Sequence, residues 1–347
     1  MNRLQKSVVS AVETYHGIRW VWQEMMTDKS RKDLPVTYLL MLLSTLCLMA
    51  LPYVVNQVID EIAADNRQTA SYWILGYGGV SLVGMLFGIW HDITREYIWN
   101  RNYLSSNLNT MHKLLRQTIE TLLSSESKIG AEHVESIKDR VQNILYLFLF
   151  ELSTALIVII STSIFMFTGD IVGASIMLAL TVFNFLWFFF WNTEMNERMK
   201  PVEDGFLKSQ STLVEFVTFA TSVKGAGVEK KVEAITRQAI QIPLKKDLTL
   251  WAEWWQRLEV IRKSINVIIP FGVLWYGVLV TEWSLGTISA MSAWIILLTQ
   301  QYGNIGHMMR HLASNIARLK EARLELDKPR LFEYDVGLVY APKPLGD

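Results

Sequence analysis

Six apolar runs lie along the chain, and polar segments of unequal length separate them. A bilayer core about 30 Å thick needs roughly 20 apolar residues in a helix, because unpaired backbone amides are too costly in lipid. Only Gly169 and Asp170 separate the third run from the fourth, which predicts a tight antiparallel hairpin. The pattern predicts an all-α integral membrane protein with six transmembrane helices, at about residues 36–56, 72–90, 152–168, 171–193, 264–280 and 283–309.

Two long polar segments, between the second and third spans and between the fourth and fifth, have a helical pattern. They contain few helix-breaking residues, and their apolar residues recur at helical intervals. These positions are Ile93, Tyr97, Leu104, Leu108, Met111, Leu115, Ile119 and Leu122, then Val228, Val232, Ile235, Ala239 and Ile242. We expect the membrane helices to continue into the cytosol as antiparallel helices of about 24 residues, which would project roughly 35 Å at 1.5 Å per residue. An ordinary soluble insertion is the alternative.

The positions of Lys and Arg predict the orientation, because basic residues are retained on the cytoplasmic side of a membrane. Residues 1–35, 91–140, 194–263 and 310–347 contain 32 of the 33 basic residues, and only Arg67 lies elsewhere. With an even number of spans, both termini are expected in the cytoplasm. The expected location is the cell's inner or plasma membrane.

Composition agrees with a membrane class and excludes some chemistry. Hydrophobic residues make up 51% of the 347 residues, which is rich for a soluble protein. The formal net charge is zero, so nothing in the charge balance predicts a nucleic-acid partner. The single cysteine, Cys47, lies in an apolar run, which excludes an internal disulfide and a thiolate cluster. We expect Cys47 to be a packing residue, and no metal site is predicted.

The N-terminal segment, residues 1–33, is polar and has no signal-peptide pattern, so we expect it to remain attached in the cytoplasm. Within it, residues 12–26 combine Trp20 and Trp22 with charged side chains such as Arg19. This composition suits an elbow helix that lies in the membrane interface with its tryptophans at headgroup level. A helix that faces solvent and packs on the bundle is the alternative.

Several polar side chains lie within the predicted spans. Gln300, Asn304 and His307 recur at helical spacing in the sixth span, and His311 continues the same face. Asn184 is a comparable residue in the fourth span. Polar side chains in membrane helices usually face the bundle interior or a water-filled cavity, because lipid offers them no partner. We interpret Gln300, Asn304, His307 and Asn184 as candidates for the substrate pathway, with interhelical hydrogen bonding as the alternative.

Glu151 is the only acidic residue in the third apolar run, which covers residues 141–169. A carboxylate inside a membrane is a functional candidate by default. If this helix begins in the cytosol, however, Glu151 lies near the inner interface and is simply solvated. We favour this second interpretation.

Four stretches carry a resemblance to a known family. They occur in the family's order and read ALPYVVNQVID at 50–60, KIG and then IKD within 128–139, VKGAGVE at 223–229 and WSLGTIS at 283–289. Together with the topology, they resemble the type-1 transmembrane domain of ATP-binding cassette (ABC) exporters, over residues 34–325. The resemblance implies the ABC exporter type-1 transmembrane fold. It also implies pairing with a second six-helix half, as a homodimer or a heterodimer, to form the translocation pathway.

The family continues into an ATPase domain, and the resemblance implies that such a domain is the partner of this chain. No phosphate-binding loop of the form G-x-x-x-x-G-K-[ST] occurs in the sequence, and Gly225 and Gly227 are interpreted as a turn. Residues 326–347 resemble the linker toward the ATPase domain, which we expect as a separate chain or as a missing C-terminal part. ATP and Mg²⁺ would bind that domain, and no cofactor is predicted on this chain.

The resemblance further implies two short coupling helices, near residues 123–132 and 215–222. These helices would dock into the ATPase domains and transmit their movement to the membrane helices. The coupling residues implied in this way are Lys128, Gly130, Glu215, Phe216 and Thr218.

The sequence therefore predicts the permease subunit of an ATP-driven ABC exporter. A catalytically silent membrane module that binds and regulates a partner protein is the alternative. The near absence of buried carboxylates disfavours an ion-coupled transporter. No catalytic triad, carboxylate pair or metal cluster stands out, so we predict no chemistry on this chain itself, only a part in an ATP-hydrolysing translocase.

Overall fold

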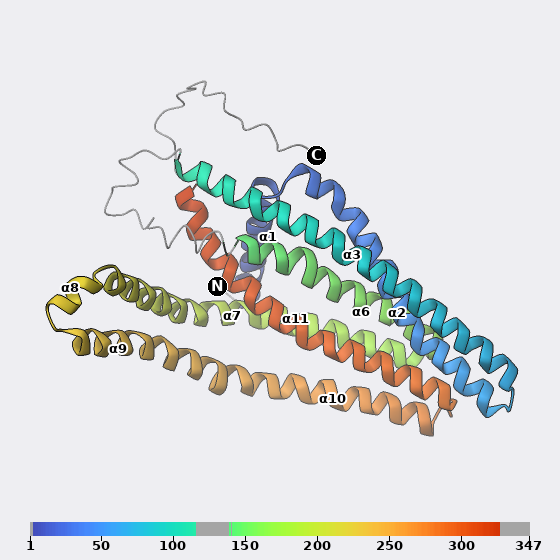
Figure 1. Cartoon of the computed structure of the whole chain (residues 1–347). Helices are drawn as coiled ribbons and strands as arrows, with labels where there is room; N and C mark the ends of the chain where they lie inside the picture. The colour runs from blue at the N-terminus through green and yellow to red at the C-terminus, as the bar shows by residue number, and fades with distance from the viewer. Residues whose placement is uncertain (1–2, 116–138, 140, 327–347) are drawn as a thin grey trace.

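Helices account for nearly all of the computed structural model, which describes residues 3–115, 139 and 141–326 (Figure 1). The elements are α1 (Arg3–Glu24), α2 (Asp28–Ala63), α3 (Arg67–Leu115), η1 (Leu147–Leu152), α6 (Ser153–Gly169), α7 (Ile171–Thr218), α8 (Ala220–Gly225), α9 (Glu229–Leu248), η2 (Thr249–Trp255), α10 (Gln256–Leu279) and α11 (Leu285–Leu326). The π-helical segments η1 and η2 run directly into α6 and α10. No strand occurs in these described ranges, and the predicted all-α class is confirmed.

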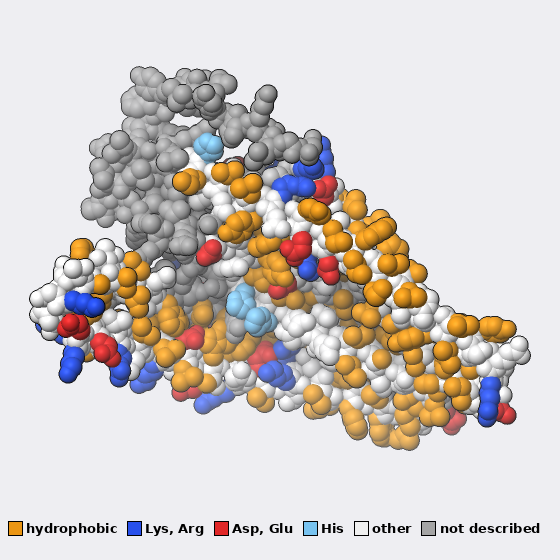
Figure 2. Space-filling model, viewed as in Figure 1, with side chains coloured by type: hydrophobic (Ala, Val, Ile, Leu, Met, Phe, Trp, Pro, Cys, Tyr) orange, Lys and Arg blue, Asp and Glu red, His pale blue; other side chains and the backbone are white. Residues whose placement is uncertain are grey.

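The three tight connections lie at one end of the bundle (Figure 1). Residues 64–66 join α2 to α3, Asp170 joins α6 to α7, and residues 280–284 join α10 to α11. The short helix α8 lies at the opposite end, where α7 turns into α9. Figure 2 shows mostly hydrophobic side chains over the half of the molecule near the tight connections, apart from a few charged side chains at its tip, whereas more charged side chains lie over the middle and the α8 end. The two ends of the bundle therefore differ as the loop lengths and basic residues predict.

The predicted hairpin between the third and fourth spans is confirmed, and Asp170 forms its turn. The backbone of Asp170 is extended, and its carboxylate accepts a hydrogen bond of 2.5 Å from the N–H of Gly173. A carboxylate at this position satisfies one of the free amides at the start of a helix. A Cβ on Gly173 would lie 3.1 Å from both Met291 and Val273, so α7 begins in close contact with α10 and α11.

Helices α3 and α7 continue well beyond the predicted spans, as expected from the helical pattern of the two long polar segments. They contain 49 and 48 residues, respectively. The predicted turn at Gly225 and Gly227 is also present, and Gly227 adopts a φ of 65° there, a conformation that favours glycine. After the turn α9 packs back along α7, and a Cβ on Gly205 would lie only 2.9 Å from the Cβ of Pro243. The two helices therefore form a closely packed hairpin that ends in α8.

The end of α1 is packed against the bundle. Trp20, Val21, Met25 and Met26 are buried in one apolar cluster with residues of α2, α3 and η1. The carbonyl of Glu24 accepts a hydrogen bond from the amide of an α3 side chain, and Arg31 of α2 donates to two further carbonyls near the end of α1. The alternative interpretation of residues 12–26, a helix that packs on the bundle, expects such a contact.

Four helices in the described part of the chain are long and apolar enough to cross a membrane. They cover Asp28–Ala63, Arg67–His112, Val141–Gly169 and Ile171–Thr218, and they contain the first four predicted spans. The predicted fifth and sixth spans lie in α10 and α11, which pack against the same bundle but are not among these four helices. The count of six spans stays a prediction.

Two of the stretches that carry the family resemblance meet at the tight-connection end. Asp60, at the end of the first stretch, accepts hydrogen bonds from the Ser284 hydroxyl at 2.8 Å and from the Gly286 N–H at 3.1 Å. Gly286 opens α11 and has no room for a side chain, because a Cβ there would lie 2.4 Å from the carbonyl oxygen of Asn56. The stretches at residues 50–60 and 283–289 therefore form one junction between α2 and α11.

Replacing Asp60 with alanine is expected to lower the free energy of unfolding by about 1 kcal/mol, because the first turn of α11 loses its acceptor. Chemical unfolding of the purified chain in mixed micelles measures this change. The Glu61→Ala variant is the control, since it removes the neighbouring carboxylate and leaves the bonds of Asp60 in place. Equal stability of the two variants would show that the Asp60 contact does not support α11.

Candidate functional site

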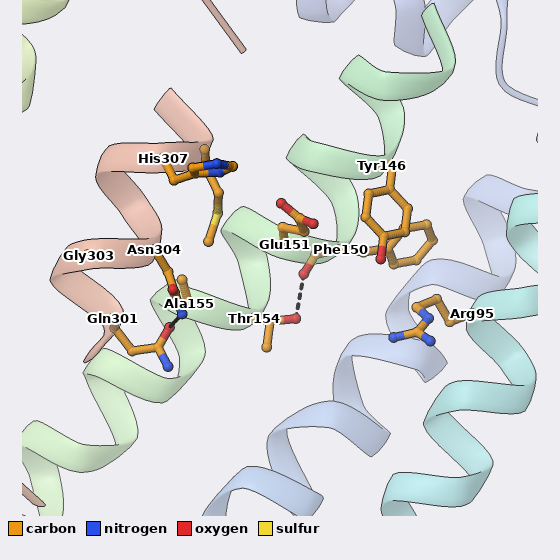
Figure 3. Close-up of a pocket in the computed structure, with 11 residues that line it drawn as sticks. Arg95, Tyr146, Phe150, Glu151, Thr154, Ala155, Gln301, Gly303, Asn304 and His307 are labelled. Carbon is orange, nitrogen blue, oxygen red and sulfur yellow. Dashed lines mark hydrogen bonds between the residues drawn. The ribbon is translucent and has the colours of Figure 1, made fainter. Parts of the chain in front are cut away.

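A cavity of about 740 Å³ lies between α3, the η1–α6 helix and the middle of α11 (Figure 3). Its wall combines aromatic, amide and charged side chains, which is the kind of lining that binds and orients a small molecule. The lining residues are Arg95, Tyr146, Phe150, Glu151, Thr154, Ala155, Gln301, Gly303, Asn304, His307 and Met308. The cavity is therefore built from helices that lie far apart in the sequence.

Arginine, glutamate and histidine side chains line this cavity. Arg95 of α3 forms ion pairs with Asp92 at 3.4 Å and Glu96 at 3.6 Å, on its own helix. Glu151 of η1 and His307 of α11 project into the space between their helices (Figure 3). Glu151 has no ion-pair or side-chain hydrogen-bond partner among the described residues. Arg95 therefore has two carboxylates of its own helix within 3.6 Å, whereas Glu151 has no cationic side chain paired with it among the described residues.

The position of Glu151 depends on the π-helical segment η1. A π turn inserts an extra residue into a helix, and such turns are frequent at functional sites. In η1 the carbonyls of Leu149 and Phe150 accept hydrogen bonds from the hydroxyls of Ser153 and Thr154, which stabilise the irregular backbone. Tyr146 packs tilted against Phe150, with ring centroids 6.0 Å apart. Local hydroxyl and aromatic contacts therefore hold Glu151 at the cavity wall.

The sequence-predicted pathway residues divide between this cavity and other places. Asn304 and His307 line the cavity, whereas Gln300 is exposed and its neighbour Gln301 lies in the wall instead. The amide of Asn304 donates to Gln301 Oε1 at 3.4 Å. His311, one turn beyond His307, lies outside the cavity lining, and the two imidazoles pack with centroids 4.5 Å apart. No three metal-ligating side chains come together anywhere in the described residues.

Asn184 lies in a separate buried network that joins α7 to α10. Its side-chain amide exchanges two hydrogen bonds with the amide of Asn266, at 2.8 and 3.0 Å. Its Oδ1 atom also accepts a hydrogen bond of 3.0 Å from Arg262. Asn184 is 2% exposed, and these bonds are the interhelical hydrogen bonding that the alternative interpretation expects. Its part in a substrate pathway stays a prediction.

Arg262 and Glu259 form a buried ion pair at the centre of this network. Both guanidinium nitrogens that face Glu259 donate to its carboxylate, at 2.9 and 2.5 Å. Arg262 also donates to the carbonyl of Tyr302 on α11 at 3.4 Å and lies over the ring of Phe188 on α7, 4.8 Å from its centroid. The contacts of Arg262 therefore link α10 to both α7 and α11.

Sequence reasoning missed this ion pair. The sequence predicts a cytoplasmic position for Arg262, because this residue precedes the apolar run of the predicted fifth span. In the structure it is 3% exposed, and it contacts Asn184 and Tyr302, which belong to predicted spans. Glu259 is 5% exposed and lies one helical turn earlier. The available signal was an acid and a base three residues apart at the edge of an apolar run, because residues at this spacing are neighbours on a helix and a buried charge needs a partner.

The end of the bundle that carries α8 has a second, shallower hollow of about 520 Å³. Phe216, Val217, Val223 and Ile240 contribute to its apolar floor, between the end of α7, α8 and the start of α9. Of the predicted coupling residues, Phe216 lines this groove, and Glu215 and Thr218 are exposed beside it. The other two, Lys128 and Gly130, lie outside the described residues, as does all but Leu326 of the linker predicted at residues 326–347.

Comparisons with known proteins agree on the class of this chain. A bacterial Atm1-family ABC exporter, solved with ATP bound, has a similar fold, with a TM-score of 0.64 at 17% sequence identity. The match covers 86% of this chain and 54% of the exporter, so the chain spans about half the length of that protein. No curated protein sequence matches the chain.

The family comparison extends over most of the sequence. The model of the ABC transporter transmembrane region matches residues 34–302, which is more than half of the chain. This match agrees with the bundle of long apolar helices and identifies an integral membrane protein with an exporter-like transmembrane fold. The chain belongs to the ABC transporter transmembrane-region family.

Proposed function

We propose that this chain is the permease half of an ATP-driven exporter. Two six-helix halves, identical or different, would pair to enclose the translocation pathway, with both termini in the cytoplasm of a cell whose plasma or inner membrane holds the complex. ATPase domains on a partner chain, or on a continuation of this one, would bind ATP and Mg²⁺. The observation that carries the proposal is the long α7–α9 hairpin with its exposed apolar groove, in a chain of the ABC transmembrane family.

The positions of the two hollows support two separate roles, cargo binding in the middle of the bundle and ATPase coupling at its α8 end. The 740 Å³ cavity lies at the middle of α11, where a cargo in transit would be held. The groove at α8 lies at the far end of the α7–α9 hairpin, away from the apolar half of the molecule (Figures 1 and 2). A rigid helix pair of this length can convey the movement of a docked domain to the membrane helices. We infer that the α8 end, with Glu215, Phe216 and Thr218, is the coupling surface for an ATPase domain.

Truncating Phe216 to alanine is expected to uncouple ATP hydrolysis from transport. The groove would lose its aromatic wall, so the number of cargo molecules moved per ATP should fall about fivefold or more while hydrolysis continues. Glu215→Lys should act in the same direction by reversing a charge at the rim. Parallel assays of phosphate release and of cargo uptake in reconstituted vesicles give the ratio.

The matched control for Phe216→Ala is Phe271→Ala, which removes an exposed phenyl ring from α10. Its ratio of transport to hydrolysis is expected to equal that of the unmodified protein. An unchanged ratio of transport to hydrolysis in both Phe216→Ala and Glu215→Lys would show that this surface does not couple the two processes.

Transport by the reconstituted complex tests the proposed function itself. Vesicles that contain the chain together with its ATPase are expected to accumulate cargo only with ATP and Mg²⁺, and vanadate should stop the accumulation. Cargo movement that follows an ion gradient and ignores vanadate would instead identify an ion-coupled transporter.

A further inference from the structure

We propose that the cavity between α3, η1 and α11 binds an amphipathic organic cation, whose ammonium group pairs with the carboxylate of Glu151. This inference rests on the proposed function, since it names the class of cargo that the same cavity would take. The juxtaposition that carries it is an unpaired carboxylate, an aromatic wall and two amides around one space of about 740 Å³ (Figure 3).

The charge balance of the cavity favours a cationic ligand. The positive charge of Arg95 is already compensated by Asp92 and Glu96, which lie within 3.6 Å of it on the same helix. The negative charge of Glu151 has no such compensation among the described residues. A partly buried carboxylate such as Glu151 gains more from an opposite charge than a fully hydrated one does. A bound cation would supply that charge, whereas an anion would add to the imbalance.

The remaining wall suits the rest of an amphipathic cation. Tyr146 and Phe150 present aromatic surface next to Glu151, and aromatic faces attract cations as well as apolar groups. Across the space, Gln301 and Asn304 offer amide oxygens and N–H groups for a polar substituent of the ligand. The volume lies within the range of sites that enclose small organic molecules.

A matched set of three fluorescent probes tests the charge preference on the full chain in nanodiscs of zwitterionic lipid. Each probe is a dansyl amide with the same linker, which ends in a trimethylammonium, a neutral tert-butyl or a carboxylate group. Fluorescence anisotropy, with empty nanodiscs as the blank, gives each dissociation constant. The cationic probe is expected to bind about tenfold or more tightly than its neutral isostere, because a hydrogen-bonded or paired charge is worth more than a neutral contact.

Substitution of Glu151 assigns the preference to one carboxylate. Glu151→Gln keeps the size of the side chain and is expected to abolish the advantage of the cationic probe while the neutral probe binds as before. Glu151→Asp keeps the charge and should retain most of the advantage. The control is Glu253→Gln, which removes an exposed carboxylate of η2 outside the cavity and should leave all three constants unchanged. Thermal unfolding midpoints of the variants establish that each is folded.

Two results would overturn the inference: a cation preference that survives Glu151→Gln, or tightest binding of the carboxylate probe. The assay contains neither ATP nor an ATPase, so its outcome does not depend on the transport cycle. Loss of the cation preference together with vanadate-sensitive transport of another cargo would refute the inference and leave the proposed function in place. A cation preference that depends on Glu151, without any ATP-driven transport, would support the inference and refute the proposed function.

Discussion

Replacing Arg262 with methionine is expected to lower the free energy of unfolding by roughly 3–5 kcal/mol, because the carboxylate of Glu259 would remain buried without its partner. The same substitution removes the hydrogen bonds to Asn184 and Tyr302, so α10 would lose its polar contacts with both α7 and α11. Equilibrium unfolding of the chain in mixed micelles, followed by circular dichroism, measures the change.

A second variant separates the ion pair from its surroundings. The double variant Arg262→Met with Glu259→Met removes both charges, and we expect it to recover most of the lost stability, since paired apolar replacements of buried ion pairs are often neutral. Arg257→Met, on the exposed side of α10, is the matched control and should change stability by about 0.5 kcal/mol or less. A loss below about 1 kcal/mol in Arg262→Met would contradict the structural role of the pair.

Replacing Gly286 with valine is expected to cost about 3 kcal/mol of unfolding free energy. The new Cβ would lie 2.4 Å from the carbonyl oxygen of Asn56 and 2.8 Å from the Asp60 carboxylate. One of these contacts is with backbone, so α2 and α11 must move apart rather than adjust a side chain. The hydrogen bond from Gly286 to Asp60 would be lost in the same movement. The measurement is the shift of the unfolding midpoint in denaturant at constant slope.

The control is Gly272→Val in α10, where a Cβ would meet nothing within 4 Å. Valine is a better helix former than glycine, so this variant should be as stable as the unmodified chain or slightly more stable. Similar stability of the two valine variants would contradict the close contact between α2 and α11 at Gly286.

Much of the fold was predictable because hydropathy in a membrane helix is a strong signal. The hairpin at Asp170, the turn at Gly227 and the extension of α3 and α7 beyond the spans all followed from local pattern. The count of spans is less sharply determined. In α10, Arg262 and Lys263 lie immediately before the apolar run, and their charges weaken the hydropathy signal that defines a span.

The cavity was only partly predictable. Helical spacing shows which residues share one face of a helix, but it does not show which other helix packs against that face. The spacing of Gln300, Asn304 and His307 placed three residues on one stripe of α11. In the structure, η1 and α3 face the side of α11 that carries Asn304 and Gln301. Gln301 therefore lines the cavity wall, and Gln300 does not. The inclusion of Glu151 depends on the π turn of η1, for which the sequence has no periodic signal.

The buried ion pair corrects one step of the sequence argument. The near absence of buried carboxylates disfavoured an ion-coupled transporter, yet Glu259 is buried. Its charge is matched by Arg262 through two hydrogen bonds, so this carboxylate serves the packing of α10 and is not free to exchange an ion. Single-sequence charge rules miss such pairs because they count each charge separately.

The most direct test of the central claim is affinity capture of the chain from native membranes, followed by mass spectrometry of the captured polypeptides. The account predicts stoichiometric peptides of an ATPase with a phosphate-binding loop, either on a separate chain or on a polypeptide that continues beyond Asp347. Capture of the chain without such an ATPase, under conditions that keep a known ABC complex intact, would contradict the account and favour a regulatory membrane module.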